Sequence, residues 1–362
     1  MRLLAVSTLG EVAGGESTLL RALPALRRRG YAPRLAVPSG GDLRKAARER
    51  DVPTVRIPLG PPERFTPAAL IGMIAAPPHL ARCDVVWLNG PPTQRLLPAL
   101  ALTGRRAVLR VNNPLSEPPA WWRRPGYWRI VQVISVPSQA TADECLAAGA
   151  PEERIHVMPP PGWEEGRRPV PARRSDNGAL RIGFVGTIEA RKGVLELIRA
   201  ADEFLDADPR ATLTVIGAPR PQDRGGYAQQ VRDAVTAART GDRIELRGYV
   251  PDARSVIAEL DVLVIPSHQE PMATVTSEAA AAGVPIVATR VGGLPEGVGD
   301  GGILVPPGDP RALAEAVRSL LDDPARRRAL AERALAGAGR FDPAAFAETM
   351  DGLLRGAVQA AR

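Results

Sequence analysis

Lysine, histidine and cysteine are scarce in this chain of 362 residues. Only two lysines, Lys45 and Lys192, stand among its 47 basic residues, and there are three histidines and two cysteines. The cysteines, Cys83 and Cys145, lie far apart and without metal-ligand spacing. Their spacing therefore indicates no metal site, and so few cysteines fit a reducing cytoplasm.

Long hydrophobic runs are also missing. The apolar stretch Ala68–Ala76 is far shorter than the ~20 residues that cross a bilayer and is stopped by Pro77 and Pro78. The first residues run directly into the pattern of a buried strand, without the profile of a cleavable signal peptide. We therefore expect no transmembrane segment and a cytoplasmic protein.

The charge is strongly biased toward arginine. The formal net charge is +7, and 45 of the 47 basic residues are arginines. This bias, beside many alanines, glycines and prolines, is typical of a GC-rich genome rather than of a nucleic-acid-binding surface. We expect no nucleic-acid partner, but the excess charge favours an acidic ligand such as a nucleoside diphosphate.

Short apolar runs alternate with helical patterns along the first half of the chain. This alternation predicts a parallel sheet with both faces covered by helices. The strands are expected at Leu3–Ser7, Pro33–Pro38, Thr54–Pro58, Val85–Asn89, Ala107–Val111, Ile130–Val136 and Ile155–Met158, and the helices at Thr18–Arg29, Leu43–Arg50, Leu96–Leu102 and Ala140–Ala148.

A second alternating series begins at Leu180. Between the two series, Pro159–Asn177 is rich in Pro, Gly, Arg and acidic residues and indicates an interdomain linker. The strands of the second series are expected at Leu180–Val185, Thr212–Gly217, Ile244–Gly248, Val262–Pro266, Pro285–Thr289 and Gly302–Val305, and the helices at Val194–Phe204, Tyr227–Ala238, Arg254–Glu259, Thr274–Ala282 and Pro310–Leu321. Two doubly wound α/β halves predict a ligand cleft between the sheets, at the carboxyl ends of their strands.

Two glutamates, Glu270 and Glu278, bracket the start of a predicted helix. The backbone N–H groups of Met272, Ala273 and Thr274 are expected to be free at that helix N-terminus, which makes an anion site. A diphosphate could bind these amides, with a ribose on Glu278 and a sugar against Glu270. The alternative is that Glu270 caps the helix and Glu278 is a solvated surface residue.

The second half resembles the retaining GT-B glycosyltransferases of family 4. The resemblance covers nearly all of Arg181–Leu321 and is carried by separated segments in the order and spacing of that family. They are the two glutamates, Ala279–Thr289, Val291–Glu296, Gly301–Asp309, Val185–Gly193 and Leu246–Pro251. It implies two Rossmann-like domains facing across a cleft: an acceptor-side domain at 1–165, a donor-binding domain at 178–341, and a tail at about 342–362 that crosses back to the first domain.

The resemblance also implies roles for single residues. Glu278 matches the glutamate that holds the nucleotide ribose, Glu270 the one that contacts the transferred sugar, and Lys192 the lysine that pairs with the donor diphosphate. A lysine in the loop between a strand and a helix suits a phosphate site. The alternative for Lys192 is a solvated loop lysine.

Further donor-binding positions follow from the same match. Gly186 would allow close approach to the phosphates. The family commonly has arginine where this chain has Thr187, and Arg191 could supply the missing charge. Tyr249 and Val250 match the loop whose backbone reads the base, although core packing explains Tyr249 equally well.

The first half resembles the family less closely. Gly14 and Gly15 match its glycine loop, which faces the donor phosphates, but they could also form a plain turn with Ser17 as a helix cap. The family usually carries a histidine near the transferred sugar where this chain has Asn112, a candidate catalytic residue that can hydrogen-bond a hydroxyl but cannot shuttle a proton at neutral pH. His268, two residues before Glu270, is either a site residue or a loop histidine in solvent.

An aromatic stretch, Glu117–Arg129, holds three of the five tryptophans. Three interpretations stay open. It could be an acceptor platform, an interfacial anchor that gives weak peripheral membrane contact, or a segment held in the core of the first domain by its aromatic side chains.

The predicted function is metal-independent, retaining transfer of a hexosyl or N-acetylhexosaminyl group, with no cofactor besides the nucleotide-sugar donor. Uridine is the expected base and guanosine the alternative. The acceptor stays open among a lipid, a glycan and a small molecule. The alternatives to a transferase are a sugar-nucleotide epimerase or a phosphorylase on the same architecture, or a non-catalytic protein that binds nucleotide sugars.

Overall fold

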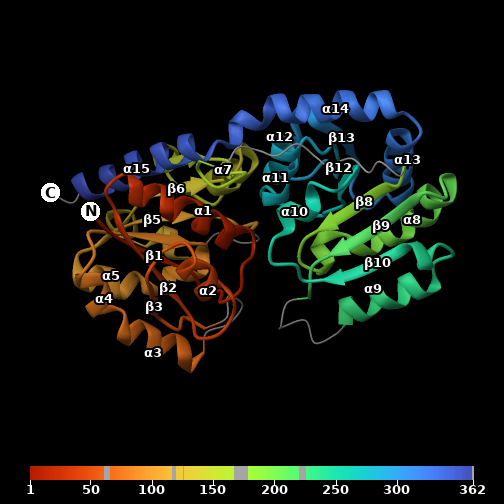
Figure 1. The fold of residues 1–362 in the computed structure, drawn as a ribbon. Coiled ribbons are helices and arrows are strands. Elements are labelled where there is room, and N and C mark those ends of the chain that lie inside the picture. The colour runs from red at the N-terminus through yellow and green to blue at the C-terminus, as the bar shows by residue number, and fades with distance from the viewer. Residues whose placement is uncertain (61–65, 116–119, 125, 167–177, 220–225, 361–362) are drawn as a thin grey trace. The chain divides into compact units, whose positions relative to one another are not determined.

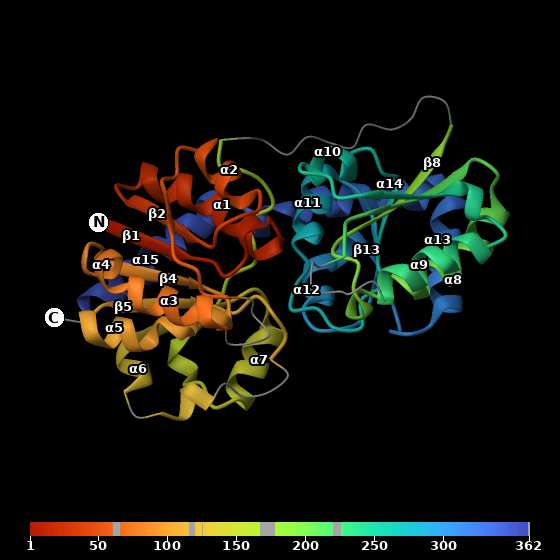
Figure 2. The same cartoon turned by 90° about the horizontal axis from the view of Figure 1, so that it is seen from below.

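The chain folds into two compact units. The structure is a computed structural model that describes all residues except 61–65, 116–119, 125, 167–177, 220–225 and 361–362. The first unit comprises Met1–Gly166 together with Phe341–Arg362, and the second comprises Arg167–Arg340. Helices lie on both faces of the sheet in each unit (Figures 1 and 2).

A seven-stranded parallel sheet forms the centre of the first unit. Its strand order is β3-β2-β1-β4-β5-β6-β7. The chain crosses from β3 back past β1 to β4, which is the doubly wound arrangement of Rossmann-like folds. The strands are β1 (Arg2–Val6), β2 (Ala32–Val37), β3 (Thr54–Arg56), β4 (Val85–Asn89), β5 (Arg106–Arg110), β6 (Val131–Val136) and β7 (Ile155–Val157).

Side chains alternate between the two faces of this sheet, because successive residues of a strand point in opposite directions. The helices of this unit are α1 (Gly14–Arg28), α2 (Leu43–Arg48), α3 (Pro67–Ala75), α4 (Pro77–Ala81), α5 (Leu97–Thr103), α6 (Tyr127–Ile130), α7 (Gln139–Ala147) and α15 (Pro343–Gln359), with 3-10 turns η1 (Pro91–Leu96), η2 (Ala120–Arg123) and η3 (Glu152–Arg154). Leu3, Ala5 and Trp87 pack against α1, α2 and α15. Leu4 and Leu88 pack on the other face, against α4 to α7.

The C-terminal helix α15 belongs to the first unit, although it follows the second in sequence. It packs along α1 and β5. Phe346, Met350 and Leu354 are buried there, and the Phe346 ring lies 6.4 Å from that of Trp87, centroid to centroid. The apolar side of α15 thus completes one face of the first core.

A six-stranded parallel sheet in the order β10-β9-β8-β11-β12-β13 forms the second unit. Its strands are β8 (Leu180–Val185), β9 (Ala211–Ile216), β10 (Ile244–Gly248), β11 (Val262–Ile265), β12 (Ile286–Thr289) and β13 (Gly302–Val305). Its helices are α8 (Val194–Ala207), α9 (Gly226–Ala237), α10 (Ala253–Ile257), α11 (Thr274–Ala282), α12 (Leu294–Val298), α13 (Pro310–Leu321) and α14 (Pro324–Gly337), with 3-10 turns η4 (Ala190–Lys192), η5 (Gly241–Arg243), η6 (Gly299–Gly301) and η7 (Ala338–Phe341), which reaches the boundary of the units.

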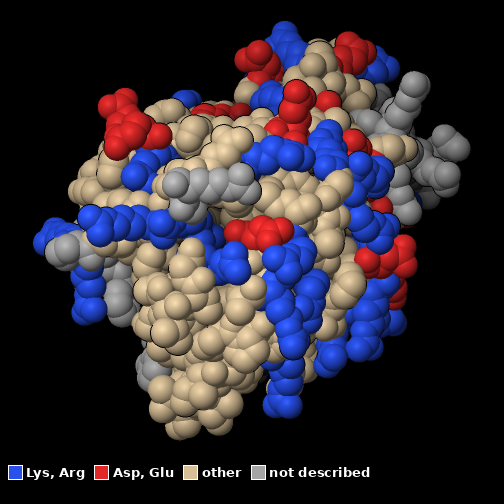
Figure 3. All heavy atoms as spheres, turned by 90° about the vertical axis from the view of Figure 1, so that its left-hand side faces the viewer, with Lys and Arg blue, Asp and Glu red and all other residues tan. Residues whose placement is uncertain are grey.

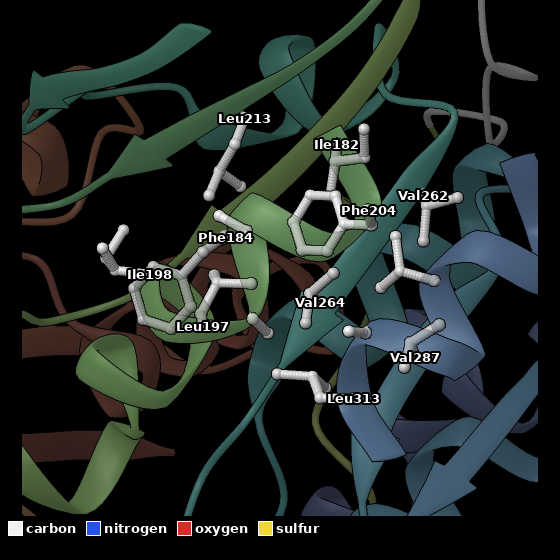
Figure 4. Packing of buried hydrophobic residues seen from close by; sticks show 14 of the residues in the cluster. Ile182, Phe184, Leu197, Ile198, Phe204, Leu213, Val262, Val264, Val287 and Leu313 are labelled. Atoms are coloured by element: carbon white, nitrogen blue, oxygen red, sulfur yellow. The ribbon is translucent and has the colours of Figure 1, made fainter. Parts of the chain in front are cut away.

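The main core of the second unit lies between the sheet and helices α8, α9 and α13. Figure 4 shows Phe184 and Val264 from the strands packed against Leu197 and Phe204 of α8 and Leu313 of α13. A second cluster on the opposite face joins β11 and β12 to α10, α11 and α12. The two hydrophobic clusters, one on each face of the sheet, fix the carboxyl ends of β8, β11 and β12 relative to one another.

The sequence located most of the elements closely, but not all of them. The helix expected at Thr18–Arg29 begins at Gly14, so Ser17 lies inside it and the capping role considered for Ser17 is wrong: the N-cap is Ala13, without a side-chain bond. Helices α3, α4, α6 and α12 were not predicted. The apolar stretch does stop before Pro77, since α3 ends at Ala75, but Pro77 is also the first residue of α4. Within the described residues, no helix has the length and apolar character needed to cross a membrane.

The first part of the predicted linker is held on the first unit. Arg21 donates to the carbonyl oxygen of Pro161 at 2.6 Å, and Glu164 and Glu165 form 2.7 Å ion pairs with Arg50 and Arg28. The prediction of a linker beginning at Pro159 was therefore wrong for these residues. Carboxylates in the segment form ion pairs with arginines of α1 and of the residues just after α2. Residues 167–177 of the predicted linker lie outside the described part.

The surface of the first unit carries apolar side chains on α3 and α5. Leu70, Ile71 and Ile74 of α3 and Leu102 of α5 are between 50% and 78% exposed. On the face that Figure 3 shows, basic side chains gather in a strip beside a broad area without charge. The excess of positive charge is thus unevenly distributed over this face.

Candidate active site

The loop after β8 carries the first group of predicted site residues. It leads from Gly186 and Thr187 through η4, which holds Arg191 and Lys192, to Gly193. Gly193 has φ +66°, and a Cβ atom there would lie 1.9 Å from the carbonyl oxygen of Pro266. Only glycine lets this loop pack against the end of the neighbouring strand β11.

The ammonium of Lys192 binds the carboxylate of Glu270 in the loop after β11. The Lys192 and Glu270 side chains are 13% and 6% exposed, so the pair is largely removed from water. Burial lowers the pKa of Lys192 from its usual value, while the Glu270 carboxylate opposes this change. The interpretation of Lys192 as a solvated loop lysine is therefore wrong.

Arg191 lies beside the same carboxylate. Its guanidinium is 3.5 Å from Oε2 of Glu270 and 2.6 Å from Oε1 of Glu189. The hydroxyl of Ser267 lies 3.5 Å from Oε2 of Glu270. Two cations thus converge on one buried carboxylate at the carboxyl edge of the sheet. The sequence placed Arg191 near the donor but missed Glu189 and Ser267, which have no distinctive spacing.

Backbone contacts bind the loops of adjacent strands to one another here. The N–H of His268 donates to the carbonyl oxygen of Arg191 at 2.7 Å, and the N–H of Gly293 donates to that of Glu270 at 3.1 Å. A Cβ atom at Gly292, whose φ is +48°, would lie 2.0 Å from the same Glu270 oxygen. Glu270 is therefore held from both sides, by the loop after β8 and by the loop after β12.

Helix α11 begins directly after this loop, with Thr274 as its first residue. Its N-cap is Ala273, which makes no side-chain capping bond, so Glu270 is not the cap that one interpretation proposed. Met272 and Ala273 are buried. The first N–H groups of a helix have no partner within it, so the start of α11 offers donors to an anion.

Glu278 lies on α11 and is 8% exposed, among neighbours from Thr276 to Ala282 that are all buried. The alternative interpretation, a solvated surface residue, is therefore wrong. Burying a carboxylate is costly unless polar groups surround it. Its place one helix turn beyond the N-terminus, on an element continuous with the Glu270 loop, makes Glu278 a candidate ligand-binding group.

Tyr249 and Val250 follow β10 at the other side of the same sheet edge. Tyr249 is 48% exposed, so core packing does not explain it. The carbonyl oxygen of Gly248 accepts a 2.8 Å hydrogen bond from the N–H of Gly217, which ties the two loops together. His268 is also exposed, and its Nε2 lies 3.4 Å from Glu196 of α8.

The first unit has its own polar cluster at the carboxyl ends of β1, β4 and β5. Nδ2 of Asn112 donates to Oδ1 of Asn89 at 2.8 Å, and Nδ2 of Asn89 donates to Oε1 of Glu16 at 3.2 Å. The Ser7 hydroxyl donates to the same Glu16 oxygen at 2.8 Å. Gly14 and Gly15 form the first turn of α1 beside this cluster rather than a separate loop.

Sequence reasoning selected Gly14, Gly15 and Asn112 but assigned no role to Glu16 or Asn89. Both are buried, at 4% and 5% exposure, and burial raises the pKa of Glu16 against the opposing hydrogen bond from Ser7. For Asn89 the available signal was a polar residue directly at the end of an apolar strand, whereas Glu16 lies in the first turn of α1.

The aromatic stretch packs in the core, as one of the three interpretations held. Trp122 and Tyr127 are buried and donate to Oε1 of Gln94 at 3.2 Å and 2.6 Å. The Tyr127 ring meets Trp128 edge to face, 4.7 Å between centroids. This confirms core packing for these residues; part of the stretch lies outside the described residues.

Comparison with known proteins gives the family. A sequence model of "Glycosyltransferase Family 4" matches residues 12–161, and one of "Glycosyl transferases group 1" matches residues 179–323. A D-inositol 3-phosphate glycosyltransferase of Catenulispora acidiphila is 29% identical over 354 residues, 84% of this chain and 81% of the relative. A glycogen synthase of Mycobacterium tuberculosis is 37% identical over 176 residues, 48% of this chain and 42% of the relative.

The fold has solved counterparts. Anabaena HepE in complex with UDP and glucose matches with a TM-score of 0.84 at 20% identity, over 98% of this chain and 99% of that one. Several of the curated relatives are matched over about half their length. Taken together with the two Rossmann-like sheets, these matches show that the chain belongs to the GT-B glycosyltransferases.

Proposed function

We propose that the chain is a retaining glycosyltransferase that moves a hexosyl or N-acetylhexosaminyl group from a uridine diphosphate sugar to an acceptor hydroxyl. The observation that carries the proposal is the convergence of Lys192 and Arg191 on Glu270, directly before the N-terminus of α11. Structural neighbours bound to UDP and UDP-glucose support the choice of donor.

The buried ion pair suggests how a donor would be held. A diphosphate at the start of α11 would compete with Glu270 for Lys192 and Arg191, because phosphate oxygens bind the same cations. Glu270, whose ion pairs would then be weaker, would accept a hydrogen bond from a hydroxyl of the sugar. Glu278 would accept a hydrogen bond from a hydroxyl of the ribose. The cations and helix amides would then stabilise the charge that develops on the departing diphosphate.

Retention requires the new bond to form on the face that the phosphate leaves. In the proposed step, the bond between the anomeric carbon and the phosphate oxygen breaks while the acceptor oxygen bonds to that carbon. The acceptor proton passes to the departing phosphate. Asn112 is an amide, so it would hydrogen-bond a substrate hydroxyl without taking this proton.

A thermal-shift panel of nucleotides and sugar nucleotides tests the donor. A ligand at 100 times its Kd stabilises the folded protein by about 2.7 kcal/mol. We expect UDP and a UDP-sugar to raise Tm and GDP to have little effect. Glu278→Ala should abolish the shift caused by UDP, whereas Glu315→Ala, an exposed helical glutamate of the same unit, should leave it unchanged.

A panel in which no nucleotide raises Tm would overturn the proposed donor. Chromatography of the reaction products separates the alternatives. An epimerase converts donor without acceptor, a phosphorylase requires free phosphate, and a non-catalytic protein binds the nucleotide without transfer or slow hydrolysis of the donor. The anomeric configuration of the product, read by NMR coupling constants, tests retention.

Metal removal tests the prediction of metal-independent transfer. Because Lys192, Arg191 and the α11 amides are assigned to the diphosphate, chelation with EDTA should leave kcat/KM unchanged, and added Mg²⁺ should not raise it. A large loss on chelation, restored by Mg²⁺, would assign the leaving-group charge to a metal ion instead.

A further inference from the structure

The inference concerns Glu16 and rests on the proposed function. The residue lies in the first turn of α1 and is buried between the ends of β1 and β4. Its Oε1 accepts from two donors, the Ser7 hydroxyl at 2.8 Å and Nδ2 of Asn89 at 3.2 Å. The Ser7 oxygen accepts a hydrogen bond from the N–H of Leu9 at 3.0 Å. The nearer acceptor for its own proton is Glu16, because the carbonyl oxygen of Leu9 lies 3.3 Å away.

This acceptor gives the hydrogen-bond chain a direction. An amide group has a donor end and an acceptor end. With Nδ2 of Asn89 turned to Glu16, Oδ1 of Asn89 faces Asn112 and accepts from its Nδ2 at 2.8 Å. Asn112 has then used a donor on the protein, and its own Oδ1 is the atom turned away from Asn89. A reversed Asn89 would place two acceptors, its Oδ1 and the Glu16 oxygen, against each other.

Close packing holds the chain in place. A Cβ atom at Gly15 would lie 2.8 Å from Nδ2 of Asn112 and 3.2 Å from Nδ2 of Asn89, so the first turn of α1 lies directly on both amides. Asn89 is 5% exposed, whereas Asn112 is half-buried. Asn112 is therefore the member of the chain that a substrate can reach.

We propose that Glu16 is a positioning residue: through Asn89 it turns the carbonyl oxygen of Asn112 toward the substrate, where that oxygen accepts a hydrogen bond from a hydroxyl of the transferred sugar. In this position the Asn112 carbonyl oxygen supplies the acceptor, while one N–H of its amide stays bonded to Asn89. The site would therefore discriminate against a donor sugar that lacks that one hydroxyl.

The first experiment measures hydrogen exchange at the side-chain NH₂ group of Asn112 and does not require the enzyme to turn over substrate. The chain has only four asparagines, so selective ¹⁵N-asparagine labelling resolves each side-chain NH₂ group by NMR. We expect slow hydrogen exchange for the NH₂ of Asn112 in the unmodified protein and in Glu16→Gln, which keeps an acceptor oxygen. Glu16→Met, of similar size but without an acceptor, should accelerate this exchange. Unchanged exchange in a folded Glu16→Met protein would overturn the proposal.

The second experiment reads specificity, using monodeoxy analogues of the sugar nucleotide that the thermal-shift panel identifies. One analogue should lose about tenfold in kcat/KM with the unmodified enzyme, the size of one lost hydrogen bond. In Glu16→Met that ratio should fall to about one, with Glu16→Gln restoring it. A purely structural role would lower kcat/KM for all donors equally and leave the ratio intact, which would also overturn the proposal.

The two failures are distinguishable. If the proposed function is wrong, no sugar nucleotide raises Tm or is turned over, while the Asn112 exchange rates still respond to Glu16→Met. If only the positioning role is wrong, donor is bound and transferred, but neither the exchange rates nor the ratio for the deoxy donor changes between Glu16→Met and Glu16→Gln.

Discussion

Lys192→Ala is expected to lower kcat/KM by about 10²- to 10³-fold, the usual effect of removing one group that stabilises transition-state charge. The ammonium is the group assigned to the diphosphate. Among the described residues, its loss leaves the buried Glu270 with Arg191, 3.5 Å away, as its one charged partner. A buried charge that loses its partner costs about 3–5 kcal/mol, so Tm should fall as well. Steady-state kinetics and thermal unfolding measure the two effects.

The chain supplies a control for this variant in its other lysine. The Lys45 side chain is 82% exposed, and its ammonium lies 4.0 Å from the exposed carboxylate of Glu49, which makes a weak surface ion pair. Lys45→Ala should therefore change neither kcat/KM nor Tm. The double variant Lys192→Ala/Glu270→Ala should recover part of the lost stability, because the carboxylate that lost its lysine partner is gone as well, but it should recover no activity. Full activity in a folded Lys192→Ala protein would contradict the assignment of the ammonium to the diphosphate.

Local patterns were sufficient to predict the architecture. The central strands of the two parallel sheets are short apolar runs, because they are covered on both faces, and such runs separated by helices are easy to recognise. Helices α11 and α13 have the predicted limits. α3 was missed because the stretch Ala68–Ala76 was considered only as a membrane span. Pro67 and Pro77 occupy the first positions of α3 and α4, where proline is favoured.

The candidate site was predicted in part. The resemblance located Lys192, Glu270 and Glu278, but their burial and the pairing of the first two depend on how loops of adjacent strands pack. Glu16 and Asn89 lie far apart in sequence and meet only because β1 and β4 are neighbours in the sheet. A hydrogen bond between such residues leaves no periodic signal in the chain.

Gly193→Ala is expected to destabilise the second unit by about 3 kcal/mol or more, the range that marks strain or overpacking. Left-handed backbone costs a residue with a Cβ atom about 1–2 kcal/mol. The larger part of the loss would come from the carbonyl oxygen of Pro266, which a Cβ atom would approach to 1.9 Å. Because backbone must then move, Lys192 would shift away from Glu270, and both donor binding and Tm should fall.

Gly104→Ala separates these two contributions. Gly104 has φ +65°, nearly the same as Gly193 at +66°, but nothing lies within 4 Å of the position of its Cβ atom. This variant should therefore lose only the conformational part, about 1 kcal/mol, with UDP binding unchanged. Urea unfolding of both variants measures the difference. If both variants lost the same free energy of unfolding, the backbone at Pro266 would be able to move away at little cost. Packing between the loops after β8 and β11 would then not be what holds Lys192 in place.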